Sequence, residues 1–454
     1  MPALREAPAS GRDAAYRVLA ENAARYPDFL PLTIDDRGLD AREAAFANAI
    51  AGAALRRWIT LAFLLERVGR RPLHPMQPPL QAALIAGAAQ LLLLDRVPAH
   101  AAIDETVEWT KRRVSGGASK LCNAVLRRFA GLVSDETIDA PSDGLDDLER
   151  RDVVPLDDGR LRVLTQPLLP EDPRERVRIA SSIPRALFGA WLDRHGSDAA
   201  REMALHALVI PPVILNTAHA SGALPEGLSA HDDSVSAVVD RPADLPSLLR
   251  GRSDLWVQDP TSTAALQVAD VEAIGSCSLV VDLCAGRGTK TRQLLAMCPN
   301  ARVIAADTDE PRLETLKKTL GAESRLTVST PDAALRSHPG AADLVLLDVP
   351  CSNSGVLPRR PEARYRCGED QTTRLVGLQR EILRNGASLL RTGAMLVYAT
   401  CAIDDAENLD QTEWAASELG LTLVHQRVIL PDGRPGGRPT RYRDGGFAAL
   451  LRRD

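Results

Sequence analysis

The sequence predicts a multidomain chain with an N-terminal all-α bundle, a small mixed α/β subdomain and a C-terminal Rossmann-like α/β domain. The length of 454 residues exceeds what one core usually holds, since a domain averages about 150 residues. Apolar residues follow a helical period up to about residue 129, whereas short β-rich runs alternate with helices after Gly275. These patterns place helices first and an open parallel sheet last.

Residues 1–134 are expected to form the helical bundle. Asp13 precedes one apolar-periodic run, and Asp40 precedes a second, Ala-rich run, so each run has a candidate N-cap. Prolines at positions 72, 75, 78 and 79 break the pattern before a strongly apolar third helix that begins near Leu80.

Residues 135–160 are expected to be an acidic linker. Ten acidic residues and only two arginines lie between positions 135 and 158, so the remaining chain is net positive although the whole carries −5. Basic clusters then stand out at 111–113, 127–128, 359–366 and 434–443. Each cluster fits a solvated surface, but together they keep an RNA partner open.

Residues 161–257 are expected to form the small mixed subdomain, with helices over 186–194 and 199–207 and a strand over 213–216. The C-terminal domain is expected over 258–454. Its predicted strands are 279–283, 302–307, 326–329, 344–348 and 395–400, and two more follow at 421–429 and 446–451. Helices between the first five strands predict a doubly wound parallel sheet.

The segment after the first of these strands predicts a cofactor loop. Residues 284–291 supply a glycine turn that leads into a helix, so a ligand can approach the backbone amides. Glycine turns without a ligand share this pattern. Asp307 ends the next strand and could hold the ribose of a dinucleotide or of S-adenosylmethionine. Thr291 stands where dinucleotide sites have a third glycine, which favours S-adenosylmethionine.

Two further strand ends carry thiols. Because parallel strands present their carboxyl ends at one edge, Asp282, Asp307, Asp348, Cys351 and Cys401 are expected to converge on one crevice. A lone cysteine is usually a core residue, but two at this edge predict chemistry. Thiols beside a methyl donor suit methylation of carbon 5 of a pyrimidine, which becomes nucleophilic once a thiolate adds at carbon 6.

Two charged residues are expected to assist that addition. Lys290 would supply positive charge that favours the thiolate. Asp348 would hydrogen-bond the ring nitrogen N3 of a base that has left its stack.

At these motifs the chain resembles the Sun/RsmB group of RNA cytosine-5 methyltransferases, over nearly its whole length. The similar segments are Leu283-Cys284-Ala285-Gly286-Arg287-Gly288-Thr289-Lys290-Thr291, Asp348-Val349-Pro350-Cys351-Ser352 and Tyr398-Ala399-Thr400-Cys401 with Glu407-Asn408. Near the N-terminus, Leu94-Asp95-Arg96-Val97-Pro98-Ala99-His100-Ala101-Ala102 and Asn123-Ala124-Val125-Leu126-Arg127-Arg128 resemble the NusB-type RNA-binding domain of the rRNA members, and Asp444-Gly445-Gly446-Phe447 resembles the closing strand.

The resemblance implies a role for each matching residue. Cys401 would be the nucleophile and Cys351 would release the product, with Asp348 and Lys290 as further catalytic residues. The implied contacts to S-adenosylmethionine are Cys284, Ala285, Gly286, Arg287, Gly288, Thr289, Lys290, Asp307, Asp332 and Asp348. The implied substrate is ribosomal RNA, of the 16S type.

The chain also departs from the family pattern. Gly286-Arg287-Gly288-Thr289 replaces Ala-Pro-Gly-Gly, so a β-branched residue stands where the family has glycine, which would weaken cofactor binding. Arg360-Pro361-Glu362-Ala363-Arg364-Tyr365 replaces His-Pro-Asp-x-Lys-Trp, and Ile214 replaces an arginine. These changes predict an altered substrate choice.

Three alternatives stay open: a DNA cytosine-5 methyltransferase, which would use Pro350-Cys351; a methyltransferase of tRNA or another RNA; and a non-catalytic RNA-binding or assembly protein. The seven cysteines show neither zinc spacing nor a disulfide framework, and no apolar run reaches about 20 residues. We therefore expect a cytoplasmic monomer with no metal and no membrane contact.

Overall fold

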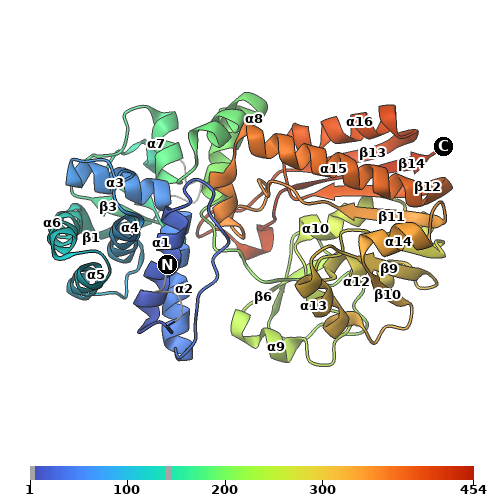
Figure 1. The fold of residues 1–454 in the computed structure, drawn as a ribbon, viewed down its shortest axis with the longest axis horizontal. Helices are drawn as coiled ribbons and strands as arrows, with labels where there is room; N and C mark the ends of the chain where they lie inside the picture. Colours follow the sequence, from blue (N-terminus) through green and yellow to red (C-terminus); the bar gives the residue numbers. More distant parts are fainter. Residues whose placement is uncertain (1–5, 140–145) are drawn as a thin grey trace. The chain divides into compact units, whose positions relative to one another are not determined.

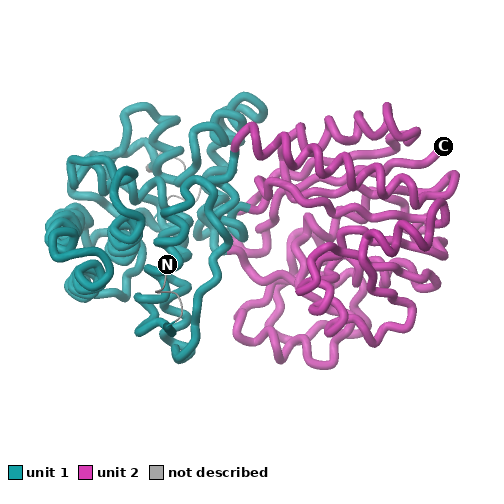
Figure 2. The backbone as a smooth tube through the Cα atoms, in the orientation of Figure 1, with its two compact units in different colours: residues 1–210, 357–367, 434–437 teal, residues 211–356, 368–433, 438–454 magenta. Residues whose placement is uncertain are grey.

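A computed structural model describes residues 6–139 and 146–454 of the chain. The structure divides into two compact units, and each is described by itself (Figure 2). Unit 1 comprises residues 1–210, 357–367 and 434–437, and unit 2 comprises residues 211–356, 368–433 and 438–454.

Unit 1 begins with the expected helical bundle (Figure 1). Its helices are α1 (Gly11–Ala23), α2 (Ala41–Arg56), α3 (Trp58–Gly69), α4 (Pro78–Leu93), α5 (Ala99–Arg113) and α6 (Gly116–Leu132). Asp40 caps α2 as predicted, because its side chain accepts from the backbone N–H of Glu43. Asp13 is not the cap of α1. Ser10 takes that position, and Asp13 is buried, where it accepts from Trp109 Nε1 at 2.8 Å.

The acidic segment contributes structure to unit 1, so its prediction as a plain linker is wrong for the described residues. The elements here are β1 (Val133–Asp139), the 3-10 helix η2 (Asp146–Glu149), β2 (Val153–Pro155) and β3 (Arg160–Leu164); the strands form an antiparallel sheet in the order β1-β3-β2. Val153, Val154 and Leu161 are buried, so a few apolar residues suffice to join a core. Residues 140–145 of this segment lie outside the described residues.

Helices α7 (Pro173–Ala180) and α8 (Arg185–His206) follow the small sheet. The two predicted helices over 186–194 and 199–207 correspond to the two halves of α8, which meet at a kink at Gly196, where the backbone is not helical and φ is 80°. The predicted subdomain 161–257 is not a single body. Its residues up to 210 belong to unit 1, and those from 211 belong to unit 2.

A short segment from late in the sequence completes the core of unit 1. Residues 357–367 carry the 3-10 helix η5 (Pro361–Arg366), in which Arg364 is fully buried. Its guanidinium donates to the backbone oxygens of Arg56 at 2.9 Å and Ala207 at 2.8 Å, and the Tyr365 hydroxyl donates to Leu55 O at 2.8 Å. Burial lowers the pKa of Arg364 to about 10. Arg364 is therefore a structural residue and not part of an exposed basic cluster.

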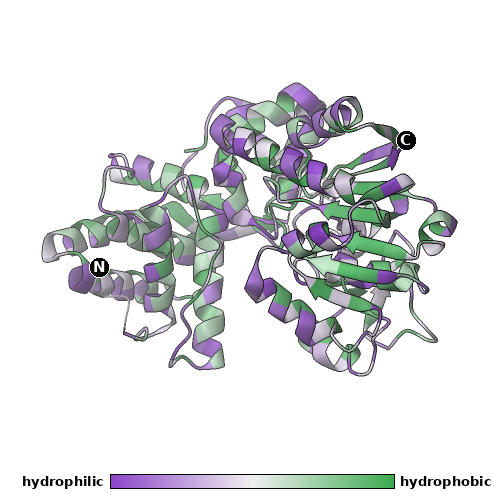
Figure 3. Cartoon of the chain, turned by 45° about the vertical axis from the view of Figure 1, so that its right-hand side comes forward, coloured by the Kyte–Doolittle hydropathy of each residue, from purple (hydrophilic) through white to green (hydrophobic). Residues whose placement is uncertain are grey.

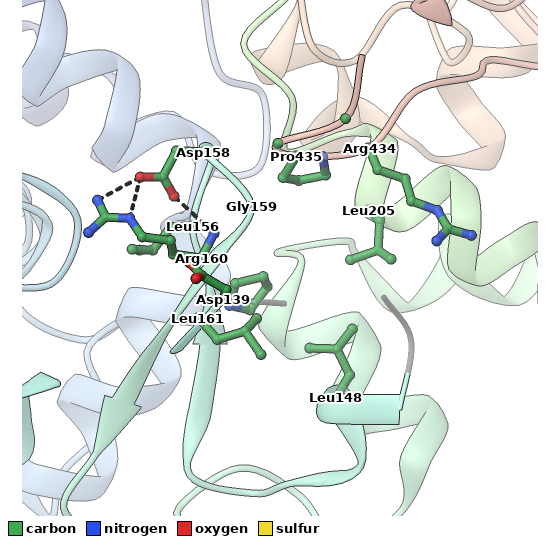
Figure 4. Close-up of a pocket in the computed structure, with 13 residues that line it drawn as sticks. Asp139, Leu148, Leu156, Asp158, Gly159, Arg160, Leu161, Leu205, Arg434 and Pro435 are labelled. Atoms are coloured by element: carbon green, nitrogen blue, oxygen red, sulfur yellow. Dashed lines mark hydrogen bonds and ion pairs between the residues drawn. The ribbon is translucent and has the colours of Figure 1, made fainter. Parts of the chain in front are cut away.

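A second late segment, 434–437, lines a cavity of about 250 Å³ in the same unit (Figure 4). A Cβ on Gly159 would lie 2.8 Å from Gly436 Cα, so the two backbones meet only because both residues are glycine. Arg434 forms an ion pair with Glu202 at 2.6 Å. This arginine, predicted within a basic cluster, is therefore already neutralised by a carboxylate.

Unit 2 is built on a seven-stranded sheet (Figure 1). The strands are β8 (Leu279–Asp282), β9 (Arg302–Ala306), β10 (Leu326–Ser329), β11 (Ala342–Asp348), β12 (Leu390–Thr400), β13 (Leu421–Ile429) and β14 (Gly446–Arg453). Their order is β10-β9-β8-β11-β12-β14-β13, with parallel pairing among the first five and antiparallel pairing by β14. Six of these strands agree with the predicted bounds to within two residues, whereas β12 begins five residues before the predicted 395–400.

Helices cover both faces of this sheet. They are α11 (Val271–Gly275), α12 (Thr289–Met297), α13 (Glu310–Leu320), α14 (Pro331–Ser337), α15 (Glu369–Leu389) and α16 (Leu409–Glu418). Val281 and Val345 join a core with α14, α15 and α16, whereas their neighbours Val280 and Leu344 join a core with α11 and α12. Successive strand residues point to opposite faces, and because helices cover both faces, both sets of residues are apolar. The strands of this sheet are accordingly mostly green in Figure 3.

The remainder of unit 2 precedes this sheet. A four-stranded sheet has the order β5-β6-β4-β7, from β4 (Ile214–Asn216), β5 (Leu228–Ala230), β6 (Ser236–Val239) and β7 (Trp256–Val257). The short helical elements η3 (Pro242–Asp244) and α9 (Leu245–Leu248) lie between β6 and β7, and α10 (Pro260–Ala264) and η4 (Ala265–Val268) follow β7. Across residues 6–139 and 146–454, no helix combines the length and the apolar character that crossing a bilayer requires.

Candidate active site

The sheet order explains why the predicted site residues meet. Strands β9, β8, β11 and β12 are consecutive neighbours and run parallel, so their carboxyl ends share one edge. Asp282 ends β8, Asp307 follows β9, Asp348 ends β11, and Cys401 follows β12. Residues that are far apart in sequence therefore collect at one edge of unit 2.

The loop after β8 has the conformation that a close ligand requires. Gly286 has φ 55° and Gly288 has φ 89°, which is the left-handed region that favours glycine. A Cβ on Gly288 would lie 3.1 Å from the side chains of Leu316 and Leu320, whereas Gly286 has no neighbour within 4 Å on that side. Thr289 is the first residue of α12, so its β-branched side chain stands on helical backbone; the weaker cofactor binding expected from this residue stays a prediction.

Asp307 links this loop to the end of β9 through hydrogen bonds. Its carboxylate accepts from Gly286 N and from Asp309 N, each at 2.8 Å, and the residue is 8% exposed. Each oxygen keeps a lone pair, so the carboxylate can still accept from two hydroxyl groups of a ligand. Asp332 lies one strand further along, exposed in the first turn of α14 after β10.

The other predicted loop residues differ in exposure. Cys284 and Lys290 are half-buried and Ala285 is buried, whereas Arg287 and Thr289 are exposed. The backbone of this loop, rather than the side chain of Arg287, therefore borders the space beside Asp307.

Asp282 is the most deeply buried carboxyl of the group. It is fully buried, and its Oδ2 accepts from the Thr291 hydroxyl at 2.6 Å. Burial raises the pKa of Asp282 to about 7. This carboxyl therefore carries a proton for part of the time at neutral pH.

Lys290 and Asp348 form an ion pair at the ends of α12 and β11. Lys290 Nζ donates to Asp348 Oδ2 at 2.8 Å. Burial alone would lower the pKa of Lys290, but Asp348 outweighs it and raises that pKa. The ammonium therefore stays charged, and it interacts electrostatically with Cys401.

The two predicted thiols are in direct contact. Cys351 Sγ and Cys401 Sγ lie 3.1 Å apart, and both cysteines are free thiols. Cys351 is buried, whereas Cys401 is half-buried. The hydrogen bond with Cys401, and then burial, raises the pKa of Cys351 well above its usual range. Cys401 is the more accessible of the pair, and the hydrogen bond and burial favour the protonated form of Cys351.

Backbone contacts hold the two cysteine loops together. Gly355 N donates to Cys401 O at 2.9 Å, and Ile403 N donates to Ser354 Oγ at 3.0 Å. A Cβ on Gly355 would lie 2.6 Å from the carbonyl carbon of Gly445, so this approach requires glycine.

Three residues of the site were not assigned a role from the sequence. Glu407 accepts from Ser352 N and from Gln379 Nε2, each at 2.9 Å, and burial raises its pKa. Gln379 also donates to Pro350 O at 2.9 Å, which fixes the turn that carries Cys351. Asn353 contacts both cysteines. Glu407 belongs to the Glu407-Asn408 segment that resembles the family, but no sequence pattern indicated a role for Gln379 on α15.

Two of the positions at which the sequence differs from the family pattern have a packing role in this structure. Ile214 is buried in β4 and pairs with Val238 of β6, so it is a core residue of unit 2. The segment 360–365 belongs to unit 1, where Glu362 and Arg364 are buried.

Comparisons with known proteins match both parts of the chain. The family model described as 16S rRNA methyltransferase RsmB/F matches residues 273–422, and the NusB family model matches residues 12–131. The ribosomal RNA small subunit methyltransferase B of Xanthomonas campestris is 32% identical over 442 residues, which covers 91% of this chain and 89% of that protein. The protein of the same name from Proteus mirabilis is 28% identical and covers 91% of this chain and 92% of its own length.

A solved structure shares the fold. The protein PH0851 aligns with a TM-score of 0.66 at 19% identity, over 96% of this chain and 98% of that one.

Proposed function

This chain belongs to the ribosomal RNA small subunit methyltransferase B family, and on that premise we propose that it methylates carbon 5 of a cytosine in the RNA of the small ribosomal subunit. The methyl donor is S-adenosylmethionine, and the reaction passes through a covalent bond between Cys401 and carbon 6 of the base. The contact between two free thiols at 3.1 Å, beside the Lys290–Asp348 ion pair, is the observation that carries this proposal.

The residues of the β8 loop fit the donor. Open space beside Gly286, the remaining lone pairs of Asp307 and the amides of the first turn of α12 offer acceptors and donors for an adenosyl ribose and an amino acid group. When bound, S-adenosylmethionine supplies an electrophilic methyl group. Asp307 holds the ribose, and Asp348 stays oriented because Lys290 fixes one of its oxygens.

Cys401 acts first. Its sulfur gives up its proton, which N3 of the cytosine takes up through water, and adds to carbon 6, so the electron pair of the carbon 5–carbon 6 double bond becomes available at carbon 5. The Lys290 ammonium favours the thiolate form of Cys401 through its charge. The Asp348 carboxylate, which already accepts from Lys290, accepts a further hydrogen bond from N3–H once N3 has taken up a proton, and the protonated ring draws electron density away from carbon 6 and assists the attack.

Release follows methyl transfer. The proton on carbon 5 must leave, and its electron pair re-forms the double bond while the bond between carbon 6 and Cys401 breaks. Cys351 assists this step from its place 3.1 Å from the attacking sulfur. As the sulfur of Cys401 leaves carbon 6, Cys351 passes its own proton to that sulfur and takes up the proton of carbon 5, so both cysteines end the step as thiols. N3 of the product returns its proton to water.

The helical part of unit 1 supplies affinity for RNA. Lys111 and Arg112 of α5 have exposed side chains, at 65% and 58%, and share the one carboxylate of Glu108 at 3.9 and 3.8 Å, so the two keep a net positive charge. Arg127 and Arg128 of α6 are also exposed. Basic side chains of this kind contact phosphates without reading sequence.

The test measures product chemistry directly. The full-length protein is incubated with S-adenosylmethionine and deproteinised small-subunit RNA, and nucleoside mass spectrometry with bisulfite sequencing identifies the product and its position. We expect 5-methylcytidine at one position, loss of the product in Cys401→Ala, and retention in Cys298→Ala, which alters a buried thiol in the core of unit 2. Methylation of another atom, or an active Cys401→Ala variant, would contradict the proposal.

A further inference from the structure

Asn353 touches both thiols of the site and has no part in the mechanism above. It lies two residues after Cys351, and its Nδ2 donates to Cys351 O at 2.9 Å. Its Oδ1 accepts from Cys401 Sγ at 3.3 Å, which is within the range for a sulfur donor. One carboxamide thus connects the backbone of one cysteine to the side chain of the other.

The orientation of this carboxamide is determined by its partners. The carbonyl oxygen of Cys351 can only accept, so the NH₂ group must face it, and the amide oxygen must face Cys401. The thiol of Cys401 therefore donates its proton to Asn353, and Cys351 can donate its own proton to the sulfur of Cys401 across 3.1 Å.

The backbone at Asn353 also departs from the usual conformation. Its φ is 63°, in the left-handed region, which costs a non-glycine residue free energy that asparagine tolerates better than most. Strain of this kind persists where the surrounding structure requires a particular placement. Here the placement brings the carboxamide between the two cysteine loops.

Resting on the proposed function only for the identity of the nucleophile, we propose that Asn353 is a positioning residue that keeps the Cys401 thiol protonated and aimed until substrate binds. An amide oxygen accepts from S–H but repels a thiolate, so Asn353 favours the neutral thiol. A thiol is far less readily oxidised or alkylated than a thiolate. Asn353 would thereby protect a nucleophile that lies in contact with a second sulfur.

The other groups around Cys401 act in defined ways. Lys290, in its ion pair with Asp348, favours the thiolate. The side chains of Glu407 and Asp404 accept from Ser352 N and Ser354 Oγ, and Glu407 contributes to the raised pKa of Cys351. The Asn353 side chain forms its hydrogen bonds with Cys351 O and Cys401 Sγ. A change at position 353 therefore removes one hydrogen bond to Cys401 and leaves the Lys290–Asp348 ion pair intact.

Two variants test the inference with opposite expected signs. Asn353→Ala removes the acceptor, whereas Asn353→Asp places a negative charge beside Cys401. The rate of Cys401 alkylation by iodoacetamide is measured by peptide mass spectrometry on the full-length protein between pH 6 and 10, without RNA or cofactor. We expect alkylation at pH 7 to become about three- to tenfold faster in Asn353→Ala, the range of one neutral hydrogen bond, with the midpoint of the pH profile moving down. In Asn353→Asp the midpoint should move up.

Ser352→Ala serves as the matched control, because its hydroxyl binds Asp404 at 3.4 Å in the same loop without touching either sulfur. Its alkylation profile should match that of the unaltered chain. If the midpoints of both Asn353 variants coincide with the unaltered chain, or if both move in one direction, Asn353 does not control the proton of Cys401. The readout needs no methyl transfer, so its failure is distinct from a failure of the proposed function.

Discussion

Replacement of Asp282 by asparagine should reveal how much stability the buried carboxyl of β8 costs above neutral pH. Asp282 is fully buried, and burial raises its pKa from an ordinary 3.8 to about 7. The native state therefore binds the proton more tightly than the unfolded state. It follows that the stability of unit 2 falls as the pH rises from about 4 to about 7, and the loss is complete above that.

The size of the effect follows from the two pKa values. A difference of about three units corresponds to about 4 kcal/mol, since each unit is worth about 1.4 kcal/mol. Roughly 1.5 kcal/mol of this is already lost at pH 5, so about 2.5 kcal/mol is lost between pH 5 and pH 8. Asparagine has no such titration. The cost of any unpartnered amide atom at this position is therefore the same at every pH.

The assay therefore measures how the difference in unfolding free energy between the two proteins changes with pH, and not its absolute value. Urea unfolding of the full-length protein and of Asp282→Asn is followed at pH 5 and pH 8 by hydrogen exchange of β8 and β11 peptides, without cofactor. The stability of the variant relative to the unaltered chain should improve by about 2.5 kcal/mol from pH 5 to pH 8. Asp332→Asn, which alters an exposed carboxyl of α14, should show no such change. A difference that is constant to within about 0.5 kcal/mol would refute the reasoning.

The remaining predictions concern the proposed reaction. Cys401→Ala should neither methylate nor trap RNA, whereas Cys351→Ala should accumulate an adduct with RNA that survives denaturing electrophoresis; the reverse pattern would exchange their roles. Asp307→Ala should weaken S-adenosylmethionine binding about tenfold to a hundredfold in a calorimetric titration, because charge-assisted hydrogen bonds are lost, and unchanged affinity would place the ribose elsewhere. The double change of Lys111 and Arg112 to glutamate should weaken RNA binding at every sequence and reduce the salt dependence by about two phosphate contacts, without affecting cofactor binding.

The sequence predicted the sheet of unit 2 and the convergence of its site residues because both depend on local patterns. The strands read as short apolar runs, and parallel strands place their ends at one edge, so Cys351 and Cys401 could be brought together without knowledge of packing. The cap at Asp40 was equally local, since Ala-rich periodicity begins directly after it.

What the sequence did not predict depends on contacts between distant residues. Arg364 read as one of several clustered arginines, but it is buried because it donates to backbone oxygens of residues 56, 181 and 207. Gln379 has no marking in the sequence, and its role depends on how α15 lies against the Pro350 turn. Composition also misled for the acidic segment, where the buried pair Val153 and Val154 outweighs the surrounding charges.

Unit 1 is built from three separate segments of the chain, so it can finish folding only after the last of them has been synthesised. The first 210 residues leave the ribosome long before Arg364 and Tyr365, which bind the backbone of α2, and before residues 434–437. A chain that folds from its N-terminus as it emerges must therefore hold an incomplete bundle while most of unit 2 is translated. The last contacts of unit 1 await residues 434–437, so a product that stops before them would lack the Arg434–Glu202 ion pair and the close approach of Gly436 to Gly159 as well as strand β14.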